Sequence, residues 1–213
     1  MIKRLALLSL YAFALLATVS CYFNDDRDPV ETMFSGFMTG ETDSKGKITI
    51  LKNDFGVKYR VTEQLENIKL RPDTVYRIVA SVALDESNHA RIIQMVKAMS
   101  YIATPDSIIP DSMRGTDPVK IESIYVGGGY LNVLVGVKVQ NEESDHDLFY
   151  TRLDTPGKYT FKIYHKAYGD REMYTKHAYI SIPLWGYGLT KNDTVFLSCK
   201  GYKEDYDYKL NYK

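Results

Sequence analysis

Apolar and polar residues alternate along most of the chain after residue 32, with the period of two that a β-strand with one buried face requires. Every odd-numbered residue from 131 to 139 is Leu or Val, while Asn132, Gly136 and Lys138 mark the opposite face. The same alternation appears at residues 159–163 and again at 206–212. The pattern predicts an all-β protein.

Before residue 104 the pattern predicts five strands. They lie near Met33–Thr39, Lys47–Lys52, Val57–Thr62, Val75–Leu84 and Ala90–Ile102. The last segment also fits a helical stripe, but its neighbours and its β-branched content favour a strand. Five strands in about 70 residues match an OB-type barrel, and Gly36 permits the bend that a long first strand makes at a barrel corner. Residues 33–104 are therefore predicted to form a five-stranded OB-like barrel.

Residues 105–116 hold Pro105, Pro110 and Gly115 among Asp and Ser, and they interrupt the alternation at length. This segment is predicted to be an interdomain loop. Seven further strands follow in residues 117–213, near Val119–Val126, Tyr130–Val139, Asp147–Leu153, Lys158–Lys166, Lys176–Pro183, Thr194–Lys200 and Asp205–Tyr212. Short strands at this spacing predict an immunoglobulin-like β-sandwich. The glycines at 127–129 indicate a hairpin turn and not a phosphate cradle, because no helix follows them.

The first 20 residues have the order of a secretory signal peptide: Lys3 and Arg4, an uncharged apolar run over residues 5–19, and the small residue Ser20. A helix of that apolar run would be about 22 Å long, shorter than the roughly 30 Å hydrocarbon layer of a membrane. The sequence from Ala17 to Cys21 resembles a lipobox, although Thr18 replaces its preferred Leu. We therefore expect Cys21 to carry acyl chains such as palmitate, which attach the protein to a membrane.

Residues 21–32 follow as an acidic linker that contains Asp25, Asp26 and Asp28. This segment resembles the acidic export signal that sends lipoproteins to the cell surface in certain Gram-negative anaerobes. The alternative is an ordinary solvated linker, since such a composition cannot bury a core. The expected location is the outer membrane, facing outward, with a periplasm-facing lipoprotein as the alternative.

Three stretches of the second half resemble the NigD-like lipoprotein family. They are the residues from Asp117 to Asn132, the phrase from His165 to Asp170, and the closing run from Tyr208 to Lys213. The resemblance implies an N-terminal OB domain and a C-terminal β-sandwich. It implies no biochemical activity and no functional residue beyond Cys21.

Charge and cysteine content exclude several classes of protein. Without the signal peptide the chain has 25 basic and 27 acidic residues, so it has no electrostatic footprint for nucleic acid. With Cys21 acylated, Cys199 has no disulfide partner. Cys199 shares one face of a strand with Val195 and Leu197, and we interpret it as a small buried hydrophobe.

No catalytic, cofactor or metal motif is present in the sequence. His89, His146, His165 and His177 stand alone, without the spacing that directs two imidazoles to one metal ion. The acidic run at 142–147 lacks the Gly and Glu of a calcium loop and is interpreted as a solvated turn. Paired carboxylates of a glycosidase would escape this search, because the fold sets their separation.

Two features suggest modification or recognition. Trp185 and Tyr187 lie on a predicted loop and could form a recognition tip, or Trp185 could fill one end of the sandwich. Ser107 and Ser112 lie in triplets that resemble O-glycosylation acceptors of the same anaerobic bacteria.

Three functions remain open. The first is a non-catalytic binding module for a glycan, peptide or protein partner. The second is an immunity or inhibitor protein against a secreted bacteriocin-type toxin. The third is a polysaccharide-processing enzyme, which would require two carboxylates converging in one cleft, one of them protonated near neutral pH. Neither a cofactor nor a nucleic-acid partner is expected.

Overall fold

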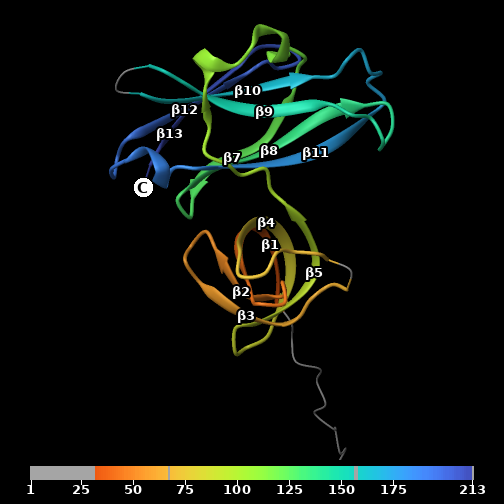
Figure 1. Cartoon of the computed structure of the whole chain (residues 1–213), viewed down its shortest axis with the longest axis vertical. Coiled ribbons are helices and arrows are strands. Elements are labelled where there is room, and N and C mark those ends of the chain that lie inside the picture. Colours follow the sequence, from red (N-terminus) through yellow and green to blue (C-terminus); the bar gives the residue numbers. More distant parts are fainter. Residues whose placement is uncertain (1–31, 67, 156–157, 213) are drawn as a thin grey trace, which may run out of the picture. The chain divides into compact units, whose positions relative to one another are not determined.

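The computed structural model describes residues 32–66, 68–155 and 158–212 (Figure 1). The predicted signal peptide, Cys21 and the three linker aspartates lie outside the described residues. Within the described part, no helix is long and apolar enough to cross a membrane. The secondary structure is almost entirely β, as the alternation of apolar residues predicts.

The first five strands close into the predicted barrel, with the order β1-β2-β3-β5-β4. Their bounds are Thr32–Thr42 for β1, Ile48–Asn53 for β2, Lys58–Glu63 for β3, Val75–Leu84 for β4 and His89–Lys97 for β5. Every pair is antiparallel except β3 and β5, which run parallel. Met38, Leu51, Ile78 and Val82 are completely buried at its centre. This arrangement is the OB-like barrel that the strand count predicts.

The fifth segment is a strand, but its predicted end at Ile102 is wrong. The barrel pairing stops at Lys97, and the next residues turn to the second half of the chain. Met99 donates to Tyr179 O at 2.8 Å and accepts from Ser181 N at 2.9 Å. Tyr101 then stacks on Tyr150 with ring centroids 4.1 Å apart. Apolar residues therefore continue past the barrel because this segment packs against a second core.

The remaining strands form a sandwich of two sheets, confirming the predicted architecture. One sheet has the order β13-β12-β10-β9-β6 and the other has the order β11-β8-β7. Their bounds are Thr104–Pro105 for β6, Lys120–Gly127 for β7, Tyr130–Val139 for β8, Asp147–Leu153 for β9, Tyr159–Lys166 for β10, Tyr174–Pro183 for β11, Thr194–Cys199 for β12 and Tyr206–Asn211 for β13.

Two details go beyond the sequence prediction. The predicted interdomain loop contributes the two-residue edge strand β6 and two 3-10 helices, Asp106–Ile108 and Asp111–Met113. Pro105 is tolerated there because an edge strand needs hydrogen bonds on one side only. In addition, β10 and β12 pair in parallel, whereas the sheets of an immunoglobulin sandwich are antiparallel.

One face of β8 packs into the sandwich core as the alternation predicts, because every odd-numbered residue from 131 to 139 is buried. Cys199 is buried beside these residues, and burial raises the pKa of its thiol to about 12. The opposite face of β8 differs from the prediction at Asn132, which is completely buried although it is polar. A buried amide requires hydrogen-bond partners, and these come from the barrel.

Candidate functional site

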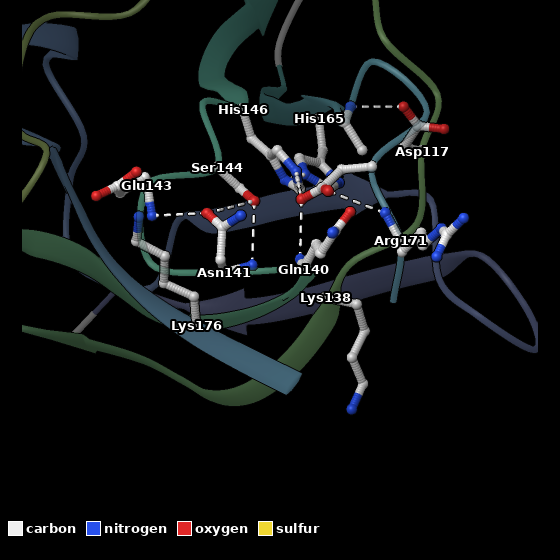
Figure 2. Close-up of polar contacts among 12 residues, drawn as sticks. Asp117, Lys138, Gln140, Asn141, Glu143, Ser144, His146, His165, Arg171 and Lys176 are labelled. Carbon is white, nitrogen blue, oxygen red and sulfur yellow. Dashed lines mark hydrogen bonds and ion pairs between the residues drawn. The ribbon is translucent and has the colours of Figure 1, made fainter. Parts of the chain in front are cut away.

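Two histidines and an aspartate meet at the end of the sandwich where β8, β9, β10 and β11 are joined by loops (Figure 2). His165 lies in β10, His146 directly precedes β9, and Asp170 lies in the turn after β10. His146 Nδ1 is 2.9 Å from His165 Nε2, and His146 Nε2 is 3.0 Å from Asp170 Oδ2. We call these three residues the histidine cluster.

The cluster continues into the segment before β7. His165 Nδ1 donates to Pro118 O at 3.1 Å. The Asp117 carboxylate accepts from Ala167 N at 2.7 Å, and Asp117 N donates to His165 O at 3.0 Å. Two of the stretches that carry the family resemblance, 117–132 and 165–170, therefore lie side by side and hold this end of the sandwich together.

The pKa values of Asp170 and His165 are both lowered, which favours the charged form of the carboxyl group and the neutral form of the imidazole. Hydrogen bonds from the Ser144 hydroxyl and Gln140 N, with further ones from His146 and Arg171 N, lower the pKa of Asp170 to about 2. The pKa of His165 is lowered, chiefly because burial disfavours its charged form. His165 is only 3% exposed, and the side chain of His146 only 6%. The cluster thus has an ionised carboxylate at one end and a buried imidazole that resists protonation near the other.

The turn that carries Asp170 also displays an aromatic side chain in a strained conformation. Tyr168 has a φ of 53°, a left-handed value that is costly for a bulky residue, and Gly169 follows with a φ of 78°. The Tyr168 side chain is 63% exposed, its hydroxyl donates to the Asp147 carboxylate, and Lys166 Nζ lies 4.8 Å from its ring. Met173, in the same loop, is 69% exposed. Strained and exposed residues of this kind concentrate at functional sites.

A second polar cluster joins the barrel to the sandwich, and we call it the junction network. Arg77 of β4 donates to Asp54 Oδ1 at 2.5 Å, to Asn132 Oδ1 at 2.9 Å and to Ser181 Oγ at 2.8 Å. Asn132 Nδ2 donates in turn to Asp54 Oδ2 at 3.0 Å. The Arg77 guanidinium also lies 4.2 Å from the centre of the Tyr130 ring. This network accounts for the buried Asn132 and fixes β4 to β8 and β11.

The predicted recognition tip is exposed at Trp185 and buried in part at Tyr187. Trp185 is 66% exposed, so it does not fill the end of the sandwich. Tyr187 instead packs on Phe161, with ring centroids 5.4 Å apart, and its hydroxyl accepts from Ala103 N at 2.7 Å. Tyr187 therefore supports the turn that displays Trp185.

The two serines predicted to be glycosylated, Ser107 and Ser112, lie in the two 3-10 helices of the segment that was predicted to be an interdomain loop, and both are exposed. The Ser107 hydroxyl donates to Asp154 Oδ2 at 2.7 Å. The Ser112 backbone oxygen accepts from Lys166 Nζ at 3.0 Å. Both residues stand on the surface, where a modifying enzyme could reach them.

Sequence spacing did not reveal the histidine cluster, because its two histidines are 19 residues apart and meet only through the pairing of β9 with β10. The other two histidines pair with acids at 2.9 Å, His89 with Asp85 and His177 with Glu122. Within the described ranges, no three His, Cys, Asp or Glu side chains are arranged to hold a metal ion. In the sequence, the only sign of this region was the family resemblance of residues 165–170, which assigned these residues no function.

Comparison with known proteins gives the family and the fold. Residues 102–212 match the family model of the NigD-like C-terminal beta sandwich domain. No curated protein sequence is significantly similar to the chain.

Several solved structures share the fold, and the three described next each match 85% of the chain. A NigD-like immunity protein from Bacteroides caccae is 23% identical, with a TM-score of 0.66 and 92% of its own chain covered. A protein described as toxin-related from Parabacteroides distasonis is 20% identical, with a TM-score of 0.69 and 94% covered. A protein described as a lipoprotein from Bacteroides fragilis is 11% identical, with a TM-score of 0.59 and 98% covered.

Proposed function

Because the chain belongs to the NigD-like family, we propose that it is a lipid-anchored, non-catalytic protein that binds a protein partner through the β10–β11 loop. The observation that carries this proposal is Tyr168, an exposed aromatic side chain in a left-handed conformation. Tyr is enriched at the centres of protein interfaces because it offers a large apolar face with a polar tip. Two contacts, with the Asp147 carboxylate and with Lys166 Nζ, hold Tyr168 in place before any partner arrives, which reduces the entropy lost on binding.

The hydrogen bonds that attach this loop to the sandwich also suit a binding protein. The histidine cluster anchors its base, because Asp170 accepts from Gln140 N at 3.0 Å and from Arg171 N at 2.9 Å. Met173 N donates to Val139 O at 3.1 Å, which fixes the end of the loop to β8. A rigid scaffold that presents exposed loop residues is the usual arrangement of β-sandwich binding proteins.

The carboxyl groups favour binding over catalysis. Among the described residues, each carboxyl group with a shifted pKa has it lowered, because hydrogen bonds and nearby cations outweigh burial. A polysaccharide-cleaving enzyme needs one carboxyl group with a raised pKa to act as the acid. These lowered pKa values support the proposal of a binding module over that of a glycosidase.

A toxin is the partner class that we favour. One similar structure is named an immunity protein and another is described as toxin-related. Neutralising a toxin by covering it would require an exposed and rigid recognition surface, such as the β10–β11 loop, and no chemistry. The proposed role is to bind and neutralise a secreted protein toxin at the membrane to which Cys21 is attached.

Site-specific photo-crosslinking in living cells tests this proposal. A photoreactive phenylalanine analogue at position 168 should capture one protein, identified by mass spectrometry, and Met173→Ala should reduce its yield. The same analogue at Val75, which is 64% exposed on the barrel, provides the control and should capture nothing specific. Capture from position 185 alone would move the binding surface to Trp185. Equal yields from positions 168 and 75 would refute the proposal.

Location is tested separately. We propose that the linker with Asp25, Asp26 and Asp28 directs the protein to the outer face of the outer membrane. Protease added to whole cells should then release the protein, while Cys21→Ser should leave it unacylated and soluble. Protection in whole cells with digestion after lysis would indicate the periplasm-facing alternative.

A further inference from the structure

The histidine cluster contains three consecutive contacts that each require one hydrogen atom. They run from Pro118 O to His165, from His165 to His146, and from His146 to Asp170, at 3.1, 2.9 and 3.0 Å. These separations are hydrogen-bond distances. Figure 2 shows the two imidazole rings directed toward one another.

The two ends of the cluster accept hydrogen bonds and donate none. Pro118 contributes a carbonyl oxygen and Asp170 a carboxylate, so all three hydrogens must come from the two imidazoles. A neutral imidazole carries one N–H, and two neutral rings supply only two. The third bond forms only if the cluster binds one extra proton.

The extra proton belongs on the ring beside the carboxylate. Burial lowers the pKa of His165, so this ring stays neutral and donates from Nδ1 to Pro118 O. His146 then donates from Nδ1 to His165 and from Nε2 to Asp170, which makes it an imidazolium paired with a carboxylate. The pKa of about 2 for Asp170 keeps that carboxylate ionised over the whole range in which histidine titrates.

We propose that His146, His165 and Asp170 form a buried proton-binding site. The bound proton completes the hydrogen bonds that hold the β8–β9 and β10–β11 loops together, and its loss as the pH rises loosens the two loops. When the third proton leaves, two lone pairs face each other about 3 Å apart in a buried place, and one contact must open. The loops are joined through Asp170, which also holds Gln140 N and Arg171 N. Loss of the contact therefore loosens both loops at once.

Other charged groups lie near the cluster, and of these Asp117 acts on the pKa of His165 by raising it. They are Asp117 before β7, Lys138 at the end of β8, Glu142, Glu143, Asp145 and Asp147 in and after the β8–β9 loop, Lys166 and Arg171 beside the β10–β11 turn, and Lys176 in β11. The sign of the effect follows from the proton count. The extra proton stabilises the folded cluster only until the cluster releases it, so this contribution is lost as the pH rises through that release. The lowered pKa of His165 acts in the opposite direction, because its buried neutral ring opposes folding at low pH, where the unfolded chain protonates both histidines.

The site itself does not depend on the proposed function, but its effect on partner binding does. Tyr168 lies between His165 and Asp170, so a loosened loop would bind a partner less tightly at higher pH. The decisive experiment therefore uses the full chain without any partner. If it succeeds while crosslinking from position 168 fails, only the proposed function is refuted.

Nuclear magnetic resonance of the full chain tests the proposal. At about pH 5.5 the two imidazoles should together carry three ring hydrogens, and at about pH 8 only two. Amide exchange at Gln140 and Arg171, corrected for intrinsic rate, should be roughly tenfold faster at the higher pH. Only two ring hydrogens at the lower pH, or equal protection at both, would overturn the proposal.

Asp170→Asn provides a comparison, because an amide nitrogen in place of Oδ2 can donate to His146 Nε2 and complete three bonds without an extra proton. That nitrogen no longer accepts from Gln140 N, whereas the amide oxygen in place of Oδ1 still accepts from Arg171 N. The pH dependence of Arg171 exchange should therefore disappear in this variant. His89→Gln is the control, since His89 contacts Asp85 at 2.9 Å on the surface. It should keep the wild-type dependence. If Asp170→Asn does not fold, the number of ring hydrogens at the two pH values in the unaltered chain decides the question alone.

Discussion

Replacing Asp54 by alanine tests the junction network, because it leaves the Arg77 guanidinium buried without its carboxylate partner. The side chains of Arg77 and Asp54 are 3% and 7% exposed. Removing one partner of a buried ion pair costs about 3–5 kcal/mol, since the remaining charge has lost its hydration. Asn132 and Ser181 still accept from Arg77, so the expected loss is near the lower end, at about 3 kcal/mol.

Urea unfolding measures this loss. For an m-value of about 2 kcal/mol/M, a loss of about 3 kcal/mol lowers the midpoint by about 1.5 M. Fluorescence of Trp185, the single tryptophan, follows the sandwich, and circular dichroism follows all strands. The two transitions should separate in Asp54→Ala, because the variant weakens the contacts of β4 with β8 and β11.

Two further variants serve as controls for this experiment. Asp205→Ala removes a surface pair, with side chains 55% and 60% exposed at Lys200 and Asp205, and should cost less than about 1 kcal/mol. Combining Asp54→Asn with Arg77→Met should cost less than the two single changes together, because the pair leaves as a unit. A loss in Asp54→Ala no larger than in the surface control would refute the reasoning.

Three other predictions concern single groups. Asp170→Asn should make the folded protein less sensitive to acid between about pH 4 and pH 2, as measured by acid unfolding followed by circular dichroism. The pKa of this carboxyl group falls from about 3.9 to about 2 on folding, so its charged form stabilises the native protein above that range and the stabilisation is lost within it. Cys199 should not react with a thiol reagent in the folded protein at pH 8 and should react fully in urea, since burial raises its pKa to about 12. Intact mass of the mature protein should show acyl chains on Cys21 and glycan on Ser107 and Ser112, and a mass equal to the acylated polypeptide alone would dismiss the glycosylation.

The positions of most strands follow from local information. The alternation predicts Val75–Leu84, Tyr130–Val139 and Asp147–Leu153 with the bounds that the structure has. Successive side chains of a strand point to opposite faces, so a run with one buried face shows its period in the sequence itself. The prediction is wrong where that face changes partner, as after Lys97, because apolar residues continue while the barrel pairing ends.

The candidate site was predicted less completely. The sequence pointed to Trp185, and its 66% exposure agrees with a recognition tip, but the histidines were interpreted as solitary. Their meeting depends on the register that places His165 opposite Leu148 in the β9–β10 pair. Register is a property of two strands together, so neither strand's own residues reveal it.

By itself the sequence determined the all-β class, the division into a barrel and a sandwich, and the family, because each of these is written in local alternation and in short phrases. Tertiary structure alone decided which polar residues share a buried place. Asn132 looked like a residue of an exposed face until the barrel supplied Arg77 and Asp54, and His146 looked isolated until β10 brought His165 within 2.9 Å. Hydrogen bonds between distant segments require atoms within about 3 Å of one another, and only the folded chain sets that separation.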